Sequence, residues 1–368
     1  MAAKSPRVFD FAGRLARLQD LMANEHVDVV LLSVGPDLPY FSGYETMPSE
    51  RLTVLVVPRD SEPVLVVPQL EAPRVSGDFL AKRPWGEIED PVEVTVSLVS
   101  SPGVVAVGDH MWSVFLTRFQ GRWMNAKWIP ASTMTSPLRV RKDDDEIALL
   151  RQAAHAVDRV MARIPAEVMF SGRSEAQVGR DLAELTVAEG HDEAAFTSVA
   201  SGPNGASPHH HPGGRLIKEG DLIVCDFGGR VGGYYSDSTR TFVVGEPSER
   251  QLEVHAAVRA ANDAGRAAVA PGIECQDLDR AARSVIEEAG FGEFFIHRTG
   301  HGIGLEVHES PYMVEGNETI LEPGMVFSVE PGVYLPGELG VRIEDIVVCQ
   351  NHGSESLNRS SRELMAVS

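Results

Sequence analysis

The sequence contains few cysteines and is short of basic residues. Its 368 residues include three cysteines, Cys225, Cys275 and Cys349, and no Cys-x-x-Cys pair. Neither a disulfide framework nor a thiolate zinc site is therefore indicated, and we expect reduced, structural thiols. Lys and Arg number 33 against 53 Asp and Glu, so the formal net charge is -20. Because this charge would repel nucleic acid and anionic membranes, we expect neither as a partner.

Long apolar runs are also absent. No stretch of about 18 uninterrupted apolar residues occurs, so no membrane span is expected. The first 22 residues follow an amphipathic pattern broken by charges, and they contain neither an apolar signal core nor a cleavage site. We therefore expect a cytoplasmic protein.

Length and patterning predict two domains with a boundary near residue 138. In residues 1–137, a helical pattern from Phe11 is followed by short Val-rich runs between Pro, Gly and Asp, which predicts an α/β domain. This part has few clustered His or carboxylates, so we expect it to serve packing or oligomerisation. Residues 138–368 begin with a long helix after an acidic cap, continue with a helix that opens on Ser174 and a helix pair at about 249–290, and end in strands.

Paired glycines mark a hairpin in "DLIVCDFGGRVGGYYSDSTRTFVV", because glycine tolerates the positive φ of tight turns. If the turn centres on Val231 and Gly232, Asp226 and Asp237 lie directly opposite each other. Opposed residues have Cβ atoms about 4.5 to 5.5 Å apart, and like charges at that distance are destabilising unless a cation lies between them. A pair of edge carboxylates on a solvated hairpin is the alternative. It is disfavoured because Asp226 follows the apolar run "LIVC", and a buried, unpaired carboxylate is expensive.

A second hairpin is predicted in "VFSVEPGVYLPGELGVRIEDIVV", where a loop centred on Gly337 would bring Glu330 and Glu344 opposite each other. The two hairpins then offer four carboxylates, and one imidazole would complete a set of five ligands. The stretch "HRTGHGIGLEVHE" supplies candidates in His297, His301 and His308, on a glycine-rich backbone that makes a helix improbable.

Four carboxylates and one imidazole form a hard, oxygen-rich site, which favours a pair of Mn, Fe(II), Co or Zn ions over a structural zinc. Two such ions activate a water and polarise a carbonyl, so the chemistry indicated is metal-assisted hydrolysis. A further run, "SGPNGASPHHHPGG", places His209, His210 and His211 in a loop rich in Pro and Gly. On composition alone, this loop is equally typical of a solvent-facing polar segment.

Together, these motifs resemble those of the pita-bread metallopeptidases, family M24, and within them the proline-specific branch of prolidases (Xaa-Pro dipeptidases) and aminopeptidase P. The resemblance covers nearly the whole chain. It implies a creatinase-like α/β N-terminal domain over residues 1–137 and an α+β pita-bread (creatinase/aminopeptidase) catalytic domain over 138–368. It also implies a dinuclear site with the ligands Asp226, Asp237, His301, Glu330 and Glu344.

The resemblance implies further roles that spacing does not assign. Glu330 would act as general base and then as general acid. His209 and His308 would hydrogen-bond the substrate and the developing oxyanion. His297 would lie near the proline subsite, and Arg342 would orient Glu344 and reach the carboxyl end of the substrate. His210 and His211 receive no role.

The activity expected from the resemblance is hydrolysis of Xaa-Pro dipeptides by a homodimer with two divalent ions, manganese first and cobalt, zinc or iron as alternatives. Substrates would be small peptides with proline in the second position. Aminopeptidase P, which acts on longer peptides, shares every residue named above and stays open as an alternative. Methionine aminopeptidases usually lack the extra domain, while creatinase and the metal-free binding proteins of this fold have lost ligands that are intact here.

Overall fold

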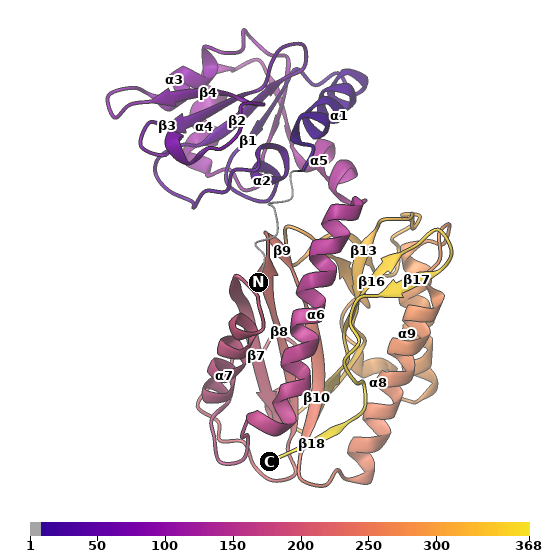
Figure 1. The fold of residues 1–368 in the computed structure, drawn as a ribbon. Coiled ribbons are helices and arrows are strands. Elements are labelled where there is room, and N and C mark those ends of the chain that lie inside the picture. Colours follow the sequence, from indigo (N-terminus) through magenta and orange to yellow (C-terminus); the bar gives the residue numbers. More distant parts are fainter. Residues whose placement is uncertain (1–8) are drawn as a thin grey trace. The chain divides into compact units, whose positions relative to one another are not determined.

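The structure is a computed structural model, and it describes residues 9–368 (Figure 1). The chain divides into two compact units, one that ends at Arg139 and one that begins at Val140. Residues 1–8, which belong to the stretch predicted to contain no signal core, lie outside the described residues. Within the described range, no helix combines the length and the apolar character that crossing a membrane requires.

The first unit is built on one six-stranded mixed sheet. Strands β1 to β3 are antiparallel neighbours, whereas β4, β5 and β6 are added in parallel. In spatial order the strands are β4 (Ala81–Trp85), β3 (Val64–Pro68), β2 (Val54–Pro58), β1 (Val29–Leu32), β5 (Val104–Val107) and β6 (Lys127–Pro130). The helices are α1 (Phe11–Asn24), α2 (Asp37–Ser42), η1 (Ala72–Arg74), α3 (Pro91–Val96), α4 (Ser113–Arg122) and α5 (Ser132–Arg139).

The Val-rich runs of this unit form its central strands because both of their faces are covered. Every residue of β1 and β2 is buried. A strand buried on both faces has no use for polar alternation, which explains the continuous apolar runs. The predicted α/β architecture of the N-terminal part is thus confirmed.

The second unit contains four longer helices and two short 3₁₀ segments. Helix α6 starts at the acidic cap, where Asp143 and Glu146 form a capping box, a feature that contributes about 1 kcal/mol. Helix α7 opens on Ser174, as predicted, with a second capping box to Gln177. The segments are α6 (Asp144–Glu167), α7 (Glu175–Ala188), η2 (Gly202–Ala206), α8 (Glu249–Ala268), α9 (Cys275–Glu288) and η3 (Gly292–Phe294).

Three sheets complete the second unit. The first has the order β18 (Met365–Val367), β10 (Ser238–Val244), β8 (Leu222–Val231) and β7 (Glu193–Ser201), with β9 (Tyr234–Tyr235) paired to β8. The second has the order β12 (Glu309–Met313), β11 (Gly300–Gly302), β13 (Val326–Val329), β16 (Asp345–Cys349) and β17 (Ser354–Ser356). The third is the hairpin of β14 (Gly332–Leu335) and β15 (Leu339–Arg342).

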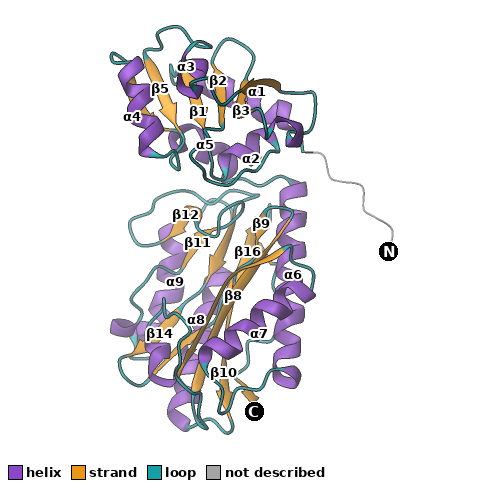
Figure 2. Ribbon diagram, turned by 90° about the vertical axis from the view of Figure 1, so that its left-hand side faces the viewer, coloured by secondary structure: helices purple, strands orange, loops and turns teal. Residues whose placement is uncertain are grey.

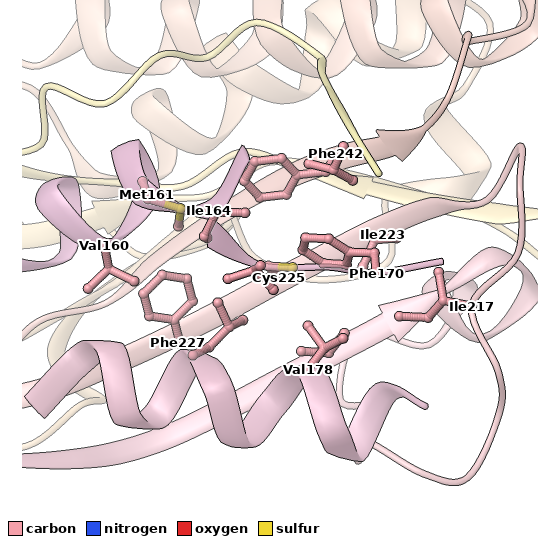
Figure 3. Packing of buried hydrophobic residues seen from close by; sticks show 14 of the residues in the cluster. Val160, Met161, Ile164, Phe170, Val178, Ile217, Ile223, Cys225, Phe227 and Phe242 are labelled. Carbon is pink, nitrogen blue, oxygen red and sulfur yellow. The ribbon is translucent and has the colours of Figure 1, made fainter. Parts of the chain in front are cut away.

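The first sheet packs on both faces, which decides where its polar side chains go. Figure 2 shows β8 and β10 with α6 and α7 on one side and α8 and α9 on the other. Ile223, Cys225 and Phe227 of β8 pack against α6 and α7, as Figure 3 shows. Leu222 belongs to the other cluster, with α8. Because side chains alternate along a strand, Asp226 shares the face of Leu222 and points away from the α6–α7 core.

Candidate metal centre

The first predicted hairpin is present, but its register differs from the prediction. Strands β8 and β10 pair Asp226 with Thr239, and Phe227 with Ser238. The turn centres on Gly232 and Gly233, which both have positive φ, +57° and +90°. A two-residue hairpin turn with positive φ at both centres strongly prefers Gly, Asn or Asp at these positions, whereas the predicted centre would have placed the β-branched Val231 there.

Asp226 and Asp237 are therefore not directly opposed, and the prediction of a facing pair was wrong. The register differs by two residues on the β10 strand, since Asp226 faces Thr239 instead of Asp237. A shift of two residues preserves the face on which a side chain lies. Asp226 and Asp237 thus remain diagonal neighbours on one face, and oxygens of both lie within 4.8 Å of each other and of a Glu344 oxygen.

The second predicted hairpin has the expected register. Strands β14 and β15 pair Gly332 with Arg342, so the loop centres on Gly337, whose φ is +76°. Beyond the hairpin, β13 and β16 continue with Val329 opposite Asp345. Glu330 and Glu344 lie between these two ladders and face each other in the same register, which confirms the predicted loop centre.

Two glycines place His301 on β11, between β12 and β13 of the second sheet. A Cβ atom at Gly300 would lie 1.9 Å from the carbonyl oxygen of Ser328, and one at Gly302 would lie 2.2 Å from that of Ser310. Only glycine permits this close approach of three backbones. The motif "GHG" therefore forms a strand packed closely between β12 and β13. Its single side chain beyond Cα, the imidazole of His301, lies in the site.

The five predicted ligands converge in one cluster. The imidazole Nε2 of His301 lies 3.2 Å from Glu330 Oε1 and 3.7 Å from Asp237 Oδ2. Nitrogen and oxygen atoms of His301, Glu330 and Glu344 fall within 4.8 Å of one another, as do those of Asp237, His301 and His308. The groups overlap, so the five side chains form a single continuous set of donors.

The donor set fits divalent cations. His301 Nδ1 donates to the carbonyl oxygen of Gly302 at 3.0 Å, so in the neutral ring Nε2 is an acceptor directed at the Glu330 carboxylate. Two acceptors at such a distance need a cation between them. In addition, Asp226 Oδ1 and Glu344 Oε1 are buried without a hydrogen-bond partner. Buried oxygens without donors are rare, and a bound ion is one of the explanations for them.

The charges of the cluster are mutually destabilising without such ions. Burial, with the charges of Glu344, Asp226 and Glu330, raises the pKa of Asp237 well above its usual range. Burial and the charges of Glu330 and Asp226 do the same to the pKa of Glu344. Burial acts in the same direction on Glu330, but in the absence of metal a protonated His301 ring donates to this carboxylate, and its hydrogen bond and charge lower the pKa of Glu330 to about 2. The crowding of carboxylates is what a pair of dications would compensate.

Arg342 links the two hairpins that carry the carboxylates. Its Nη2 donates to Asp226 Oδ2 at 2.7 Å, and its Nε donates to Thr239 Oγ1 at 3.1 Å. Thr239 in turn donates to Glu344 Oε2 at 2.8 Å. Arg342 thus contacts Asp226 directly and reaches Glu344 only through Thr239.

A directed chain of hydrogen bonds leads from Arg342 to His297. Arg342 Nη1 donates to the Tyr334 hydroxyl at 3.0 Å, and His297 Nδ1 donates to the Arg298 carbonyl at 2.7 Å. Burial lowers the pKa of His297, so its ring is neutral near pH 7. Its Nε2, 2.8 Å from the Tyr334 oxygen, must therefore accept the hydroxyl proton. The ring orientation of His297 is fixed at both nitrogens.

All nine predicted site residues line one cavity of about 670 Å³, a size typical of small-molecule sites. Their assignment as ligands and as substrate contacts stays a prediction. The sequence reasoning missed four further lining residues and two buried supports. Thr239 could have been found by alternation, since it shares its face with Asp237, and Tyr334 because it lies in the hairpin of the two glutamates. The lining residues missed are Phe196, Pro208, Arg298 and Val307.

Comparison with known proteins places the chain in a family. Residues 148–351 match metallopeptidase family M24, and residues 14–141 match the creatinase/prolidase N-terminal domain. The chain belongs to metallopeptidase family M24. This membership confirms the predicted family, fold class and enzyme class. M24 metallopeptidases act with divalent metal ions, and the cluster of carboxylates and His301 gives this chain the donors for them.

Relatives of this M24 chain match it along nearly its whole length. A protein named "Probable dipeptidase PepE" from Mycobacterium tuberculosis is 42% identical over 364 residues, which are 97% of this chain and 96% of that protein. An Xaa-Pro dipeptidase from Lactobacillus delbrueckii subsp. lactis is 34% identical over 95% of this chain and 98% of its own. The crystal structure of a prolidase from Thermococcus sibiricus has a TM-score of 0.93 at 35% identity, and covers 98% of this chain and 100% of its own.

Proposed function

We propose that this protein is an Xaa-Pro dipeptidase that hydrolyses the bond before proline. The observation that carries the proposal is the convergence of four carboxylates and one imidazole, with two carboxylate oxygens buried and unpartnered. Three further histidines and two arginines line the same cavity. The names of the M24 relatives support the substrate class.

The proposed ligands are Asp226, Asp237, His301, Glu330 and Glu344. When bound, a pair of divalent ions supplies Lewis acidity and lowers the pKa of water in the site. Manganese is the ion we propose first, with cobalt, zinc or iron as alternatives, because all of them accept this donor set.

The side chains of the chain itself would handle the proton and the oxyanion. Glu330 takes the proton from the attacking water and returns it to the proline nitrogen. Burial and the neighbouring His301 lower the pKa of His308 to about 4, so His308 donates a hydrogen bond as a neutral imidazole. His209 and His308 are proposed to stabilise the carbonyl oxygen as its charge develops.

The proline requirement follows from the amide. The bond before proline is tertiary, so its nitrogen offers no N–H for recognition, and recognition must come from the ring. The apolar side chains of Phe196, Pro208 and Val307 give the cavity surface for such a ring. We propose that His297 lies against this subsite. Four of the five N–H groups of Arg342 are engaged by protein atoms, so at most one is left for the substrate carboxylate.

The test is a peptide panel. Purified protein is incubated with Ala-Pro, Ala-Pro-Ala and Ala-Ala, with Mn²⁺ or after treatment with a chelator. We expect hydrolysis of Ala-Pro that the chelator abolishes and Mn²⁺ restores, with little hydrolysis of Ala-Ala. A preference for Ala-Pro-Ala would instead assign an Xaa-Pro aminopeptidase. A sample without bound metal, and without activity on adding Mn²⁺ or Co²⁺, would indicate a binding protein of this fold.

Assembly and location complete the proposal. We propose a homodimer formed through the N-terminal unit, residues 1–137, and a monomeric mass in sedimentation would contradict it. A cytoplasmic location is supported by the three cysteines, which are all free and buried, since free thiols are typical of reducing compartments. Appearance of activity in the culture medium rather than the cell lysate would contradict it.

A further inference from the structure

The carboxylate of Glu175 takes no part in the proposed chemistry, yet it is fully buried at the start of α7. Its Oε1 accepts hydrogen bonds from Ser201 N at 2.8 Å, Ser201 Oγ at 2.7 Å and Asn204 Nδ2 at 3.0 Å. Its Oε2 lies 2.7 Å from His210 Nε2 and 3.2 Å from Gly213 N. All of these donors belong to one segment, which starts at Ser201 and ends at Gly213.

The proton on His210 can be placed. His210 Nε2 lies 2.7 Å from Glu175 and 3.3 Å from Asn204 Nδ2, and it cannot donate to the first and accept from the second. Asn204 already donates to the other Glu175 oxygen, and the shorter contact is the one to a carboxylate. His210 Nε2–H therefore donates to Glu175, a charge-assisted hydrogen bond of the stronger kind.

The backbone of His210 is held as firmly as its ring. Its carbonyl oxygen accepts from Ser198 Oγ at 2.7 Å, and its N–H donates to the Ser207 carbonyl at 3.2 Å. Ser198 is the residue of β7 that pairs with Asp226 of β8. His210 is thus anchored both to α7 and to the strand beside a proposed metal ligand.

His209 lies between Pro208 and His210 and lines the cavity. The segment around it, residues 207–213, has no helix or strand of its own to hold it. We propose that His210 and Glu175 are positioning residues that hold His209 in its place against the substrate. The inference rests on the proposed function, in which His209 contacts the substrate. It gives a role to His210, which the sequence patterns left without one.

Kinetics of matched variants test the inference. A misplacement of about 1 Å costs roughly 100-fold in rate, so His210→Ala should lower kcat/KM for Ala-Pro by about 10- to 100-fold with Mn²⁺ present. His210→Gln keeps a donor near the Nε2 position and should recover most of the activity. The control is His211→Ala, next to it in the same loop, exposed and without a proposed role, which should match the wild type.

A double-variant cycle separates positioning from an independent effect. If His210 acts through His209, His210→Ala should change kcat/KM less than about twofold in a protein that already carries His209→Ala. The Mn²⁺ affinity of His210→Ala, measured by calorimetry, should stay close to that of the wild type, whereas its melting temperature should fall by a few degrees because buried Glu175 loses one donor. Glu175→Gln is a poorer probe, because its NH₂ group would face buried donors and threaten folding.

Three results would overturn the inference: wild-type kcat/KM in His210→Ala, His210→Gln as impaired as His210→Ala, or losses that multiply in the double variant. A crystal structure of His210→Ala gives a reading that does not depend on activity, since His209 in an unchanged, ordered position would also refute it. Absence of Ala-Pro hydrolysis by the wild type would refute the proposed function instead, and the crystal structure would still decide the positioning role.

Discussion

Arg342 donates a hydrogen bond of 2.7 Å to Asp226, although 116 positions separate the two residues in the chain. Arg342 ends β15, beside Glu344, whereas Asp226 lies in β8. One buried guanidinium therefore sets the distance between the hairpins that supply the four carboxylates. The three nitrogens of its planar guanidinium donate to Asp226, Thr239 and Tyr334 at the same time. The single nitrogen of an ammonium group cannot reproduce this spread of donors.

Arg342→Lys should weaken metal binding although it keeps the charge. Residues that orient metal ligands typically contribute 10- to 100-fold to affinity, and we expect a loss of Mn²⁺ affinity in this range. Calorimetric titration of the metal-free protein measures it. Arg163→Lys, on the outer surface of α6, is the control and should titrate like the wild type. Equal affinity of Arg342→Lys and the wild type would contradict the role of the fork.

Asp237→Asn should abolish turnover and yet stabilise the metal-free protein. The substitution removes one of several buried like charges. In chelator, the free energy of unfolding of the variant should therefore exceed that of the wild type by about 1 kcal/mol or more, and its unfolding temperature should be higher. Mn²⁺ at 100 times its Kd should add about 2.7 kcal/mol to the wild type and much less to the variant. Thermal unfolding with and without Mn²⁺ measures both effects. A fully active variant would refute the ligand assignment.

Tyr334→Phe should affect the substrate more than the metal. The variant removes the hydroxyl that orients His297, and loss of one such bond, worth about 1 to 1.5 kcal/mol, corresponds to roughly a tenfold fall in kcat/KM. We expect the lower kcat/KM to come mainly from a higher KM, with Mn²⁺ affinity changed less than in Arg342→Lys. Tyr235→Phe, in the first hairpin and outside the cavity lining, should have wild-type kinetics. A normal KM in Tyr334→Phe would exclude a contact between His297 and the substrate.

His255 should make the fold sensitive to mild acid. Burial, with the charge of Arg259, lowers the pKa of this side chain to about 4, and its side chain is 5% exposed. The unfolded chain therefore binds the proton more readily. The stability from His255 is complete above pH 6.5 and is lost as the pH falls from there to about 4. Between pH 7 and 5, wild-type protein should lose about 2 kcal/mol that His255→Gln does not lose. Urea unfolding in chelator at both pH values measures the difference, and equal losses would contradict it.

Much of the fold was predictable because local signals agree with the packing. The predicted acidic cap of α6 is present as a capping box of Asp143 and Glu146. The apolar residues that recur at helical spacing along α6 are buried: Ile147, Leu150, Ala154, Val157, Met161 and Ile164. The register of the first hairpin was not predicted correctly. Gly232 and Gly233 together carried the signal, since both central residues of this turn have positive φ and Val231 would be strained there.

The predicted cluster of carboxylates was still correct despite the wrong register of the first hairpin, because side chains return to the same face of a strand every two residues. Asp226 and Asp237 stay on one face under a shift by two, so the expected group of carboxylates was still found. Residues that act through others gave no comparable signal. Glu175 reads as an acidic residue in the first turn of a helix, and only the folded chain shows its donors from Ser201 to Gly213.

The alternation of faces along β8 also limits how this enzyme can evolve. A single residue inserted into β8 between Asp226 and the turn would rotate one aspartate towards Cys225 and Phe227, where nothing could neutralise it. Two inserted residues would leave both carboxylates where they are. We expect natural variants of this strand to differ in length by pairs of residues, or to carry a bulge wherever they differ by one.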